Sequence, residues 1–588
     1  MNNEKKLGSD IFCQALAEQG VDIMFGIPGG VVLPLYDKLN KYGHHIRHIL
    51  PRHEQGGGFA AEGYARVTGK VGVALGTSGP GATNLLTAIV NSMMDSIPIL
   101  YITGQVVEDF IGTDAFQEAD VIGMTMPCVK HSYLITKAEE IPRIMKEAFY
   151  LANTGRPGPV HVDIVKDVWF QEVVPDHDAP MDLPGYKPYP EPCADAEIQK
   201  IDEILNRENV RPLIIAGHGV EISGAQRELL QFSEKHNIPV VNTLLGLSNF
   251  PQGHENWAGM IGMHGDAVTN FAVNEANVII GVGCRFDDRI TGTLATFTKD
   301  KTFIHFEIDP SEIGKNVPTE IGILGDLKET LGRANQLLQN HTYPDWWAKI
   351  ESWKTEHGFL DFTYNPDPKN GLSQPRIIKM LSDITEGQAI VSADVGRHQM
   401  WTARFYRFKN PNSHLSSGGL GTMGVGLPYA MGAKLANPEL DVVCITGEAS
   451  IQMNIQELST AKQYHTPVKI VNLNNGYLGM VRQWQEMFYE NRYAESYMDA
   501  LPDFVKLAEA YGHVGMRISK PSDVEGALRE ALAMKDRLVF MDFLIDPKTN
   551  VFPMVGNGKG LNQMDLPPHM QDVRQTGTLK ERDYGNLS

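Results

Sequence analysis

A carboxylate and a side-chain amide follow two apolar segments in residues 441–475. The segment DVVCIT leads into Gly447-Glu448-Ala449-Ser450, an apolar-periodic run continues to Gln463, and PVKIVNLNN ends at Asn475. This order predicts a strand, a helix and a second parallel strand, which places Glu448 and Asn475 together at the carboxyl ends of the strands. Open α/β sheets bind ligands at that edge, and such oxygens beside a helix N-terminus suit Mg²⁺ and a diphosphate. The alternative is an ordinary strand–helix turn with a solvated glutamate.

A second carboxylate stands at another predicted strand-to-helix junction. Glu54 follows the apolar segment HIL and precedes GGGFAAEGYARVTG, a predicted helix rich in small residues. A carboxylate at this point lies near a helix N-terminus and can face a cleft between domains. It could equally be a simple capping carboxylate, and the local residues leave both interpretations open.

Composition limits the class of protein. The chain has 588 residues, 42% apolar residues and 57 glycines, which is typical of an α/β enzyme with two to four domains. Its formal net charge of −19 argues against nucleic acid or an anionic membrane as the main partner, because both favour basic surfaces. Small-molecule chemistry is the better expectation.

The five cysteines and the N-terminus bear on location. Cys13, Cys128, Cys193, Cys284 and Cys444 are scattered without CxxC spacing, which favours neither a zinc site nor a disulfide framework. The N-terminal residues run into an amphipathic helix without a signal or transit segment, and no stretch of about 18 uncharged apolar residues occurs. We therefore expect a cytoplasmic protein that does not span a membrane.

Two proline-rich stretches, residues 175–192 and 365–371, divide the chain into three parts. The expected domains are residues 1–185, 195–345 and 370–550, followed by a polar tail at 556–588 with little to bury. The first and third parts share a rhythm of strand, glycine-rich turn and helix, which suggests a distant internal duplication. The middle part has its own strand–helix pattern.

Five segments of the first part resemble the pyrimidine-binding domain of thiamine diphosphate enzymes: FGIPGG (25–30), RHEQ (52–55), GTSGPGATN (76–84), GTDAFQE (112–118) and TGRPGP (154–159). Residues 447–475 resemble the metal and diphosphate motif of the same enzymes, which usually runs Gly-Asp-Gly or Gly-Asp-Ala and closes with Asn-Asn. Glu448 stands where that family has Asp. The whole set, from about residue 8 to about residue 560, closely resembles the catalytic large subunits of acetolactate (acetohydroxyacid) synthases.

This resemblance implies an α/β fold of three doubly wound parallel-sheet domains: pyrimidine-binding (1–185), central and FAD-binding-like (195–345), and diphosphate- and Mg²⁺-binding (370–550). It also implies the reaction, in which pyruvate is decarboxylated and joined to a second 2-oxo acid. With pyruvate or 2-oxobutyrate as acceptor, the product is 2-acetolactate or 2-aceto-2-hydroxybutyrate, both precursors of branched-chain amino acids.

The resemblance assigns roles in the first domain. The counterpart of Glu54 hydrogen-bonds the aminopyrimidine ring of the cofactor and so promotes loss of the thiazolium C2 proton. Gly30, Phe116, Gln117 and Lys166 match positions that line the reaction pocket. For Lys166 the alternative is a solvated surface lysine.

In the third domain the resemblance implies the cofactor and metal contacts. Val395, Gly396, Arg397 and His398 match the first diphosphate contacts, with Arg397 in place of the usual Gln, and Gly447, Ala449 and Ser450 belong to the second motif. Met423 matches the residue that wedges between the two cofactor rings. Glu448, Asn475 and the Tyr477 carbonyl would ligate Mg²⁺. The longer Glu448 could change rotamer, reach through water or weaken the metal.

The middle domain is closest to the biosynthetic type, which carries FAD without using its redox chemistry. His264, Arg285 and Asp309 lie in segments close to that pattern, whereas His218 stands where a flavin-facing Gly is usual. Arg289 and Trp484 resemble residues that admit and orient the second 2-oxo acid.

The family pattern also implies at least a homodimer, because the pyrimidine half of one chain faces the diphosphate half of another, and it allows a small regulatory subunit. Two alternatives remain from the sequence. One is another 2-oxo acid decarboxylase or carboligase, such as glyoxylate carboligase, which lacks the acid corresponding to Glu54. The other is a degenerate, non-catalytic paralogue, motivated by Glu448 and His218.

Overall fold

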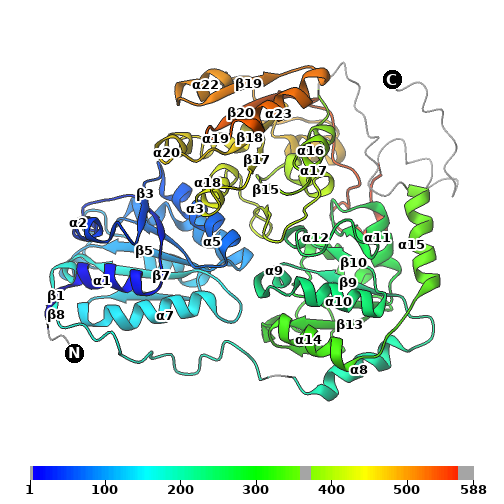
Figure 1. Cartoon of the computed structure of the whole chain (residues 1–588), viewed down its shortest axis with the longest axis horizontal. Helices are drawn as coiled ribbons and strands as arrows, with labels where there is room; N and C mark the ends of the chain where they lie inside the picture. The colour runs from blue at the N-terminus through cyan, green and yellow to red at the C-terminus, as the bar shows by residue number, and fades with distance from the viewer. Residues whose placement is uncertain (1–3, 192, 358–371, 567–588) are drawn as a thin grey trace.

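The computed structural model describes residues 4–191, 193–357 and 372–566. The chain forms three domains around three six-stranded sheets in which every strand pair is parallel. Figure 1 shows the first domain in blue and cyan, the middle domain in green and the third domain in yellow and orange, with helices on both faces of the sheets. The predicted α/β fold of three doubly wound parallel-sheet domains is confirmed.

The first sheet has the strand order β3-β2-β4-β5-β7-β6. Its strands are β2 (Ile23–Gly26), β3 (Arg47–Ile49), β4 (Gly72–Gly76), β5 (Ile99–Gln105), β6 (His131–Ile135) and β7 (Val160–Val165). Its main helices are α1 (Gly8–Glu18), α2 (Leu33–Tyr42), α3 (Glu54–Thr68), α4 (Pro80–Thr83), α5 (Leu86–Asp95), α6 (Val121–Thr125) and α7 (Ile141–Asn153). A small antiparallel pair, β1 (Lys6–Leu7) with β8 (Glu172–Val173), closes the domain.

The third sheet has the order β16-β15-β17-β18-β20-β19. Its strands are β15 (Ile390–Ala393), β16 (His414–Leu415), β17 (Val442–Thr446), β18 (Lys469–Asn474), β19 (Val514–Ile518) and β20 (Val539–Leu544). Its helices are α16 (Gln374–Ile384), α17 (Arg397–Phe405), α18 (Gly426–Ala436), α19 (Glu448–Gln452), α20 (Glu457–Gln463), α21 (Gly479–Phe488), α22 (Phe504–Ala510) and α23 (Val524–Ala533). Numbered within each domain, the first and third sheets share the order 2-1-3-4-6-5, as an internal duplication would produce.

The middle sheet has a different order, β11-β10-β9-β12-β13-β14, or 3-2-1-4-5-6 within the domain. This is the order of dinucleotide-binding sheets, which bind their ligand where the strand order reverses. The strands are β9 (Pro212–Ala216), β10 (Val240–Asn242), β11 (Trp257–Met260), β12 (Val278–Val282), β13 (Thr302–Glu307) and β14 (Ile321–Leu324). The main helices are α8 (Asp195–Leu205), α9 (Gly219–Ser223), α10 (Gln226–His236), α11 (Ala267–Glu275), α12 (Asp288–Thr291), α13 (Leu294–Phe297), α14 (Leu327–Leu337) and α15 (Pro344–His357).

The segments between and after the domains agree only in part with the predictions from the sequence. Residues 174–191 contain no helix or strand, as their prolines predict, and run from the first domain to the middle one (Figure 1). Residues 365–371 lie outside the described residues. The expectation that the tail has little to bury is wrong for its beginning, because Leu561, Met564 and Leu566 are buried in the core of the middle domain. Residues 567–588 lie outside the described range.

The first and third domains meet through α3 and α18, which approach each other backbone to backbone. A β-carbon on Gly63 would overlap the Tyr429 carbonyl oxygen, and one on Gly432 would overlap the Ala60 carbonyl oxygen. One continuous apolar core therefore includes residues of both domains, among them Phe59, Tyr429 and Met431. None of the helices in the described ranges is long and apolar enough to cross a membrane.

The helix crossing predicts a strong size limit at Gly432. Gly432→Ala should destabilise the protein by about 1–3 kcal/mol, because the new methyl group forces two packed helix backbones apart. Gly332→Ala in α14 is the matched control: a β-carbon there meets nothing within 4 Å, so the higher helix propensity of Ala should leave stability unchanged or raised by up to about 1 kcal/mol. Denaturant unfolding of both variants is the measurement. Equal effects would contradict the steric explanation.

Candidate active site

The residues expected to bind a metal come together at the end of β17 and β18. Glu448, 1% exposed, begins α19, and its Oε1 and Oε2 accept the backbone N–H groups of Tyr477 and Asn475 at 2.8 and 3.2 Å. The Asn475 Oδ1 also accepts the Tyr477 N–H, at 2.9 Å. The 475–477 turn therefore holds the Glu448 side chain, which is longer than the family's Asp, close to the Asn475 side-chain amide. These are two of the groups that were expected from the sequence to share a cation.

Burial raises the pKa of Glu448 to about 7, because few charges compensate the desolvated carboxylate. A cation beside it would favour the ionised form. Within the described ranges, no three His, Cys, Asp or Glu side chains cluster as a metal site. A cation here would therefore depend on one carboxylate, one amide oxygen, a backbone carbonyl and oxygens from a ligand or water, which is the hard-oxygen environment that Mg²⁺ prefers.

His398 is the second residue of α17, which begins directly after the turn that follows β15. A β-carbon placed on Gly396 would lie 2.7 Å from a ring atom of His398, and one placed on Gly447 would lie 3.0 Å from the ring, so a larger residue at either position would press against the imidazole. Burial, with the nearby Arg397, lowers the pKa of His398 to about 3 and keeps the ring neutral. The Ser450 hydroxyl donates to the Val395 carbonyl at 2.8 Å, which joins the two turns where the strand order of the third sheet reverses.

Arg397 is 2% exposed and binds backbone. Its guanidinium donates to the carbonyl oxygens of Thr549 and Pro547 at 2.8 and 3.2 Å, while its Nε is buried without a hydrogen bond and lies against Gly479. Burial, with a contribution from Arg482, lowers its pKa to about 10. The side chain therefore fastens the segment that follows β20 to the turn after β15.

Glu54 is held in the first domain, where it begins α3 and is 8% exposed. The Asn84 side-chain amide donates to its Oε2 at 2.9 Å. A β-carbon on Gly81 would lie 3.3 Å from its Oε1, and one on Gly79 would lie 2.9 Å from the Cα of Gln117. The glycine-rich loop after β4 thus lies between Glu54 and Gln117, and at Gly79 and Gly81 it has only backbone atoms to place there.

The other residues of this domain that were expected in the reaction pocket are more exposed to solvent than Glu54. Phe116 is 88% exposed, and Gly30 is exposed with nothing within 4 Å of a β-carbon placed on it. Lys166 is half-buried directly after β7. The loop that carries Phe116 and Gln117 is tied to the sheet by Gln105, whose amide donates to the Ala119 carbonyl at 2.9 Å.

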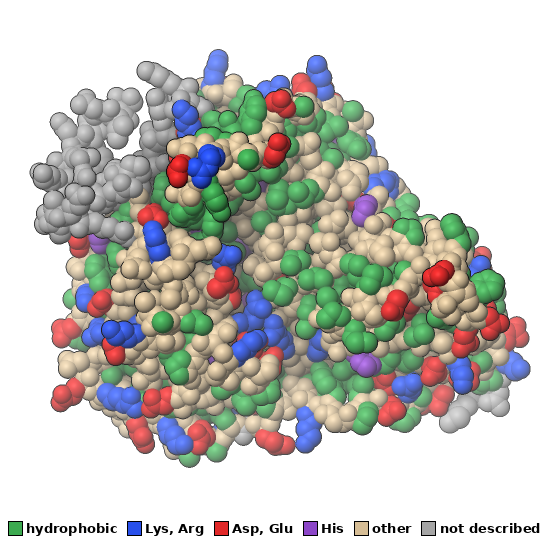
Figure 2. All heavy atoms as spheres, turned by 180° about the vertical axis from the view of Figure 1, so that it is seen from behind, with side chains coloured by type: hydrophobic (Ala, Val, Ile, Leu, Met, Phe, Trp, Pro, Cys, Tyr) green, Lys and Arg blue, Asp and Glu red, His purple; other side chains and the backbone are tan. Residues whose placement is uncertain are grey.

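A cavity of about 770 Å³ lies where the three domains meet. Gly217 and His218, after β9, and Gly283 and Cys284, after β12, line it at the point where the middle sheet reverses its strand order. The lining also includes four arginines: Arg66, Arg156, Arg285 and Arg289. Figure 2 shows Lys and Arg side chains gathered beside a hollow near the centre of that face of the molecule.

Seven of the expected cofactor and substrate residues line this cavity: His264, Arg285, Arg289, Val395, Gly396, Met423 and Trp484. Asp309 does not line it, although its neighbour Ile308 does, and its carboxylate pairs with Arg156 at 3.3 Å. Glu54, Glu448 and Asn475 are outside the cavity lining.

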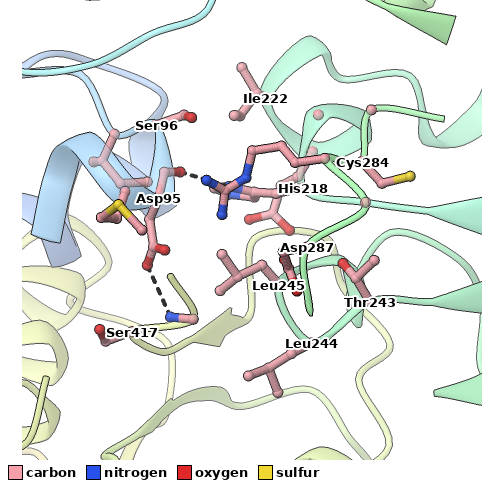
Figure 3. Close-up of a pocket in the computed structure, with 18 of the residues that line it drawn as sticks. Asp95, Ser96, His218, Ile222, Thr243, Leu244, Leu245, Cys284, Asp287 and Ser417 are labelled. Carbon is pink, nitrogen blue, oxygen red and sulfur yellow. Dashed lines mark hydrogen bonds between the residues drawn. The ribbon is translucent and has the colours of Figure 1, made fainter. Parts of the chain in front are cut away.

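His218 is turned across a domain boundary. Its Nδ1 lies 3.1 Å from the Asp95 carbonyl oxygen, as Figure 3 shows. Burial, with the nearby Arg66, lowers the pKa of His218 to about 4, so the imidazole is neutral. Its φ is −61°, an ordinary helical value, so the backbone at this position does not require glycine.

Comparison with known proteins identifies the domains. Models for the N-terminal TPP binding domain, the central domain and the C-terminal TPP binding domain of thiamine pyrophosphate enzymes match residues 6–124, 198–333 and 394–543. The acetolactate synthase large subunit of Haemophilus influenzae is 45% identical over 97% of this chain and 100% of its own length. The chain belongs to the acetolactate synthase family of thiamine pyrophosphate enzymes.

Two further relatives also match this chain over nearly its full length. The Escherichia coli acetolactate synthase isozyme 3 large subunit is 45% identical over 95% of this chain and 98% of its own length. The acetolactate synthase large subunit of Lactococcus lactis is 44% identical over 95% and 96%. The family predicted from the sequence motifs is confirmed.

Several charged residues of the cavity were not expected from the sequence. Arg156 lines the cavity and lies within the TGRPGP segment. That segment indicated the family, but no role for the Arg156 side chain followed from the sequence. Arg66, Asp95 and Glu221 lie on helices with no motif around them. Their spacing along the chain carries no signal, because only the packing of three domains brings them together.

The position of Arg397 predicts a cost in stability when it is replaced by the family's usual residue. Arg397→Gln should lower the free energy of unfolding by about 1–3 kcal/mol, because two carbonyl oxygens in a buried segment lose their charged donor. The control Arg207→Gln removes an exposed ion pair with Glu320 and should cost at most about 1 kcal/mol. Both values come from denaturant unfolding. Weaker thiamine diphosphate binding at unchanged stability would instead make the guanidinium a diphosphate ligand.

Proposed function

We propose that this enzyme uses thiamine diphosphate to decarboxylate pyruvate and joins the two-carbon unit to a second 2-oxo acid. The observation that carries this proposal is the near-complete likeness to acetolactate synthase large subunits, 44–45% identical over 95–97% of the chain. With pyruvate or 2-oxobutyrate as acceptor, the product is 2-acetolactate or 2-aceto-2-hydroxybutyrate. The role is a step of branched-chain amino acid biosynthesis.

Bound thiamine diphosphate supplies a nucleophilic thiazolium carbon and an electron sink for the decarboxylation of a 2-oxo acid. Glu54 is the acid–base group that would share a proton with the aminopyrimidine ring. In the described part of the chain only the Asn84 amide donates to its carboxylate, at Oε2. Asn84 thus orients the carboxylate and leaves Oε1 for that proton.

Gly30, Phe116, Gln117 and Lys166 are proposed to form the substrate side of the same site. They lie on loops at the carboxyl ends of the first sheet and line no part of the cavity that contains Met423 and Trp484. This separation, together with the 88% exposure of Phe116, supports an assembly of at least two copies in which the first domain of one completes the third domain of the other.

Glu448, Asn475 and the Tyr477 carbonyl are proposed to hold Mg²⁺. The hydrogen bonds that hold the Glu448 carboxylate against the 475–477 turn support this assignment. Val395, Gly396, His398, Gly447, Ala449 and Ser450 would surround the diphosphate, and Met423 would contact the cofactor rings. The role of Arg397 is then to set the position of these turns.

FAD is proposed for the large cavity. The cavity lies at the strand-order reversal of a 3-2-1-4-5-6 sheet, its volume of about 770 Å³ suits a small-molecule ligand, and its arginines suit a diphosphate. His264, Arg285 and Asp309 are the candidate contacts. His218 fits this proposal because it binds the Asp95 carbonyl instead of needing a partner in the ligand.

The names of the relatives bear on the partners of this chain. The relatives are named large subunits, which supports a small regulatory partner for this chain as well. The substrates are small 2-oxo acids. The cytoplasmic location expected from the sequence stays a prediction.

The deciding experiment is an assay of the purified full chain with thiamine diphosphate, Mg²⁺ and pyruvate. We expect acetolactate to form, and we expect added FAD to bind and raise the rate even when it is supplied as a redox-inactive analogue. Release of acetaldehyde alone would favour a simple decarboxylase. Cofactor binding without pyruvate consumption would favour a non-catalytic paralogue.

Glu54→Gln should slow activation of the cofactor by roughly 10²-fold or more, because the amide keeps the size but cannot accept the proton. Thiamine diphosphate affinity should change little. The measurement is exchange of the cofactor C2 proton by NMR, in parallel with cofactor binding. Exchange at the parent rate would remove Glu54 from the acid–base role.

Glu448→Ala should weaken Mg²⁺ binding in the presence of thiamine diphosphate by roughly 10-fold or more, because a charged ligand is lost; even outer-shell changes cost about 10–100-fold in metal affinity. Glu448→Asp, which restores the family residue, is the control and should bind at least as tightly as the parent. Mg²⁺ titration by calorimetry gives both values. Parent affinity in the Ala variant would show that Glu448 is no ligand.

Trp484→Leu should erode the preference for 2-oxobutyrate over pyruvate as acceptor, which we expect to be worth about 1–3 kcal/mol in the parent. The indole lines the cavity and packs edge-on against Phe488 with ring centroids 5.2 Å apart. Phe488→Leu is the control, because Phe488 forms the same ring pair without lining the cavity. The product ratio with both acceptors present is the measurement, and an unchanged ratio in Trp484→Leu would exclude it from the selectivity site.

A further inference from the structure

Asp95 contacts all three domains although no motif contains it. It ends α5, is 2% exposed, and its carboxylate accepts from Arg66 of the first domain at 2.6 Å. The same carboxylate accepts the backbone N–H groups of Gly418 and Gly419 of the third domain at 3.1 and 2.7 Å. Its backbone carbonyl accepts from His218 of the middle domain. Figure 3 draws the bonds from His218 and from the segment after Ser417.

Residues 417–424, whose N–H groups at positions 418 and 419 donate to Asp95, include Met423. Asn91, one turn before Asp95 on α5, accepts from the hydroxyls of Ser417 and Thr422 at 2.6 and 2.9 Å. At its other end, the Gly424 N–H donates to Asp394, which follows β15, at 2.8 Å. The segment is thus bound to the first domain through α5. Among the described residues, its own domain holds only its two ends, where Gln399 donates to the Ser417 carbonyl at 3.1 Å and Asn454 donates to the Gly424 carbonyl at 2.9 Å.

Close packing leaves the segment little freedom. A β-carbon on Gly418 would lie 2.6 Å from Leu245 of the middle domain, and one on Gly419 would lie 2.8 Å from the Asp95 Oδ1. The segment itself has no helix or strand to fix its backbone. Its position therefore depends on the side chains that bind its N–H groups and hydroxyls.

We infer that Asp95, supported by Asn91, is a positioning residue that sets the placement of Met423 from the neighbouring domain. Asp95 and Met423 both line the cavity, as do Arg66 and His218, which hydrogen-bond Asp95. An ionised acceptor that receives two backbone N–H groups holds a loop more firmly than a neutral one. This role rests on the proposed function only where Met423 contacts the cofactor; the placement of the segment does not depend on it.

The test compares two variants of the full chain. Asp95→Asn keeps the side-chain size but removes the charged acceptor for residues 418 and 419. Arg66→Met removes the same buried ion pair and leaves that acceptor in place. Hydrogen–deuterium exchange is followed in peptides that cover 417–424, and we expect roughly 10-fold faster exchange there in Asp95→Asn, with little change in Arg66→Met. If Asp95→Asn alone fails to fold, the triple variant Glu62→Gln/Arg66→Met/Asp95→Asn, which leaves no charge of the buried cluster without its partner, takes its place.

The second readout is kinetic. A misplaced Met423 should lower kcat for acetolactate by about 10-fold or more, because small displacements of groups around a reaction centre are costly, while KM for pyruvate changes less than kcat. Unchanged exchange at 417–424, or equal changes in Arg66→Met, would overturn the inference and leave Asp95 as an ion-pair partner only. Faster exchange in a chain whose parent makes no acetolactate would keep the positioning role and reject the proposed function.

Discussion

The close crossing of α3 and α18 is the constraint on which the arrangement of this molecule depends. Glycines on both helices allow the backbones to touch, so that two domains that are far apart in the sequence share one apolar core. Helix α3 begins at Glu54, and α18 begins two residues after Gly424. Because helices are stiff rods with a fixed rise per residue, the crossing sets where both of these helix starts lie within one chain.

Buried charges lie beside this crossing. Glu62 and Arg66 on α3 and Asp95 on α5 form an ion-pair cluster that is almost inaccessible to solvent. The Tyr429 hydroxyl of α18 donates to Glu62 at 2.7 Å, and Asn91 donates to both. Such a cluster contributes little net stability compared with an apolar core. All three charges lie in the first domain, so a shift of α18 along α3 would break no ion pair but would take the Tyr429 hydroxyl away from the buried Glu62 carboxylate. Glycines let the two helices touch, and this hydrogen bond opposes a shift of one helix along the other.

The sequence predicted those parts of the site that depend on local chain geometry. Glu448 and Asn475 follow consecutive strands, so a strand–helix–strand pattern was enough to place them at one edge, and family motifs located Glu54 and the loop that surrounds it. Contacts between domains could not be predicted from the sequence. Nothing near Asp95 distinguishes it from a capping residue. His218 stood out only because glycine is usual at its position, and the burial of Leu561 depends on residues of the middle domain that are distant in the sequence.

The first and third domains share one strand order but place their carboxylates differently on it. Two copies of one topology offer the same set of turns at the same edge, yet the acid Glu54 follows the second strand of one copy, whereas Glu448 follows the third strand of the other. The two carboxylates therefore do not occupy equivalent positions of the shared strand order. The two domains place their carboxylates on different turns of one scaffold, so the proposed division between proton transfer at Glu54 and metal binding at Glu448 does not follow from the topology that they share.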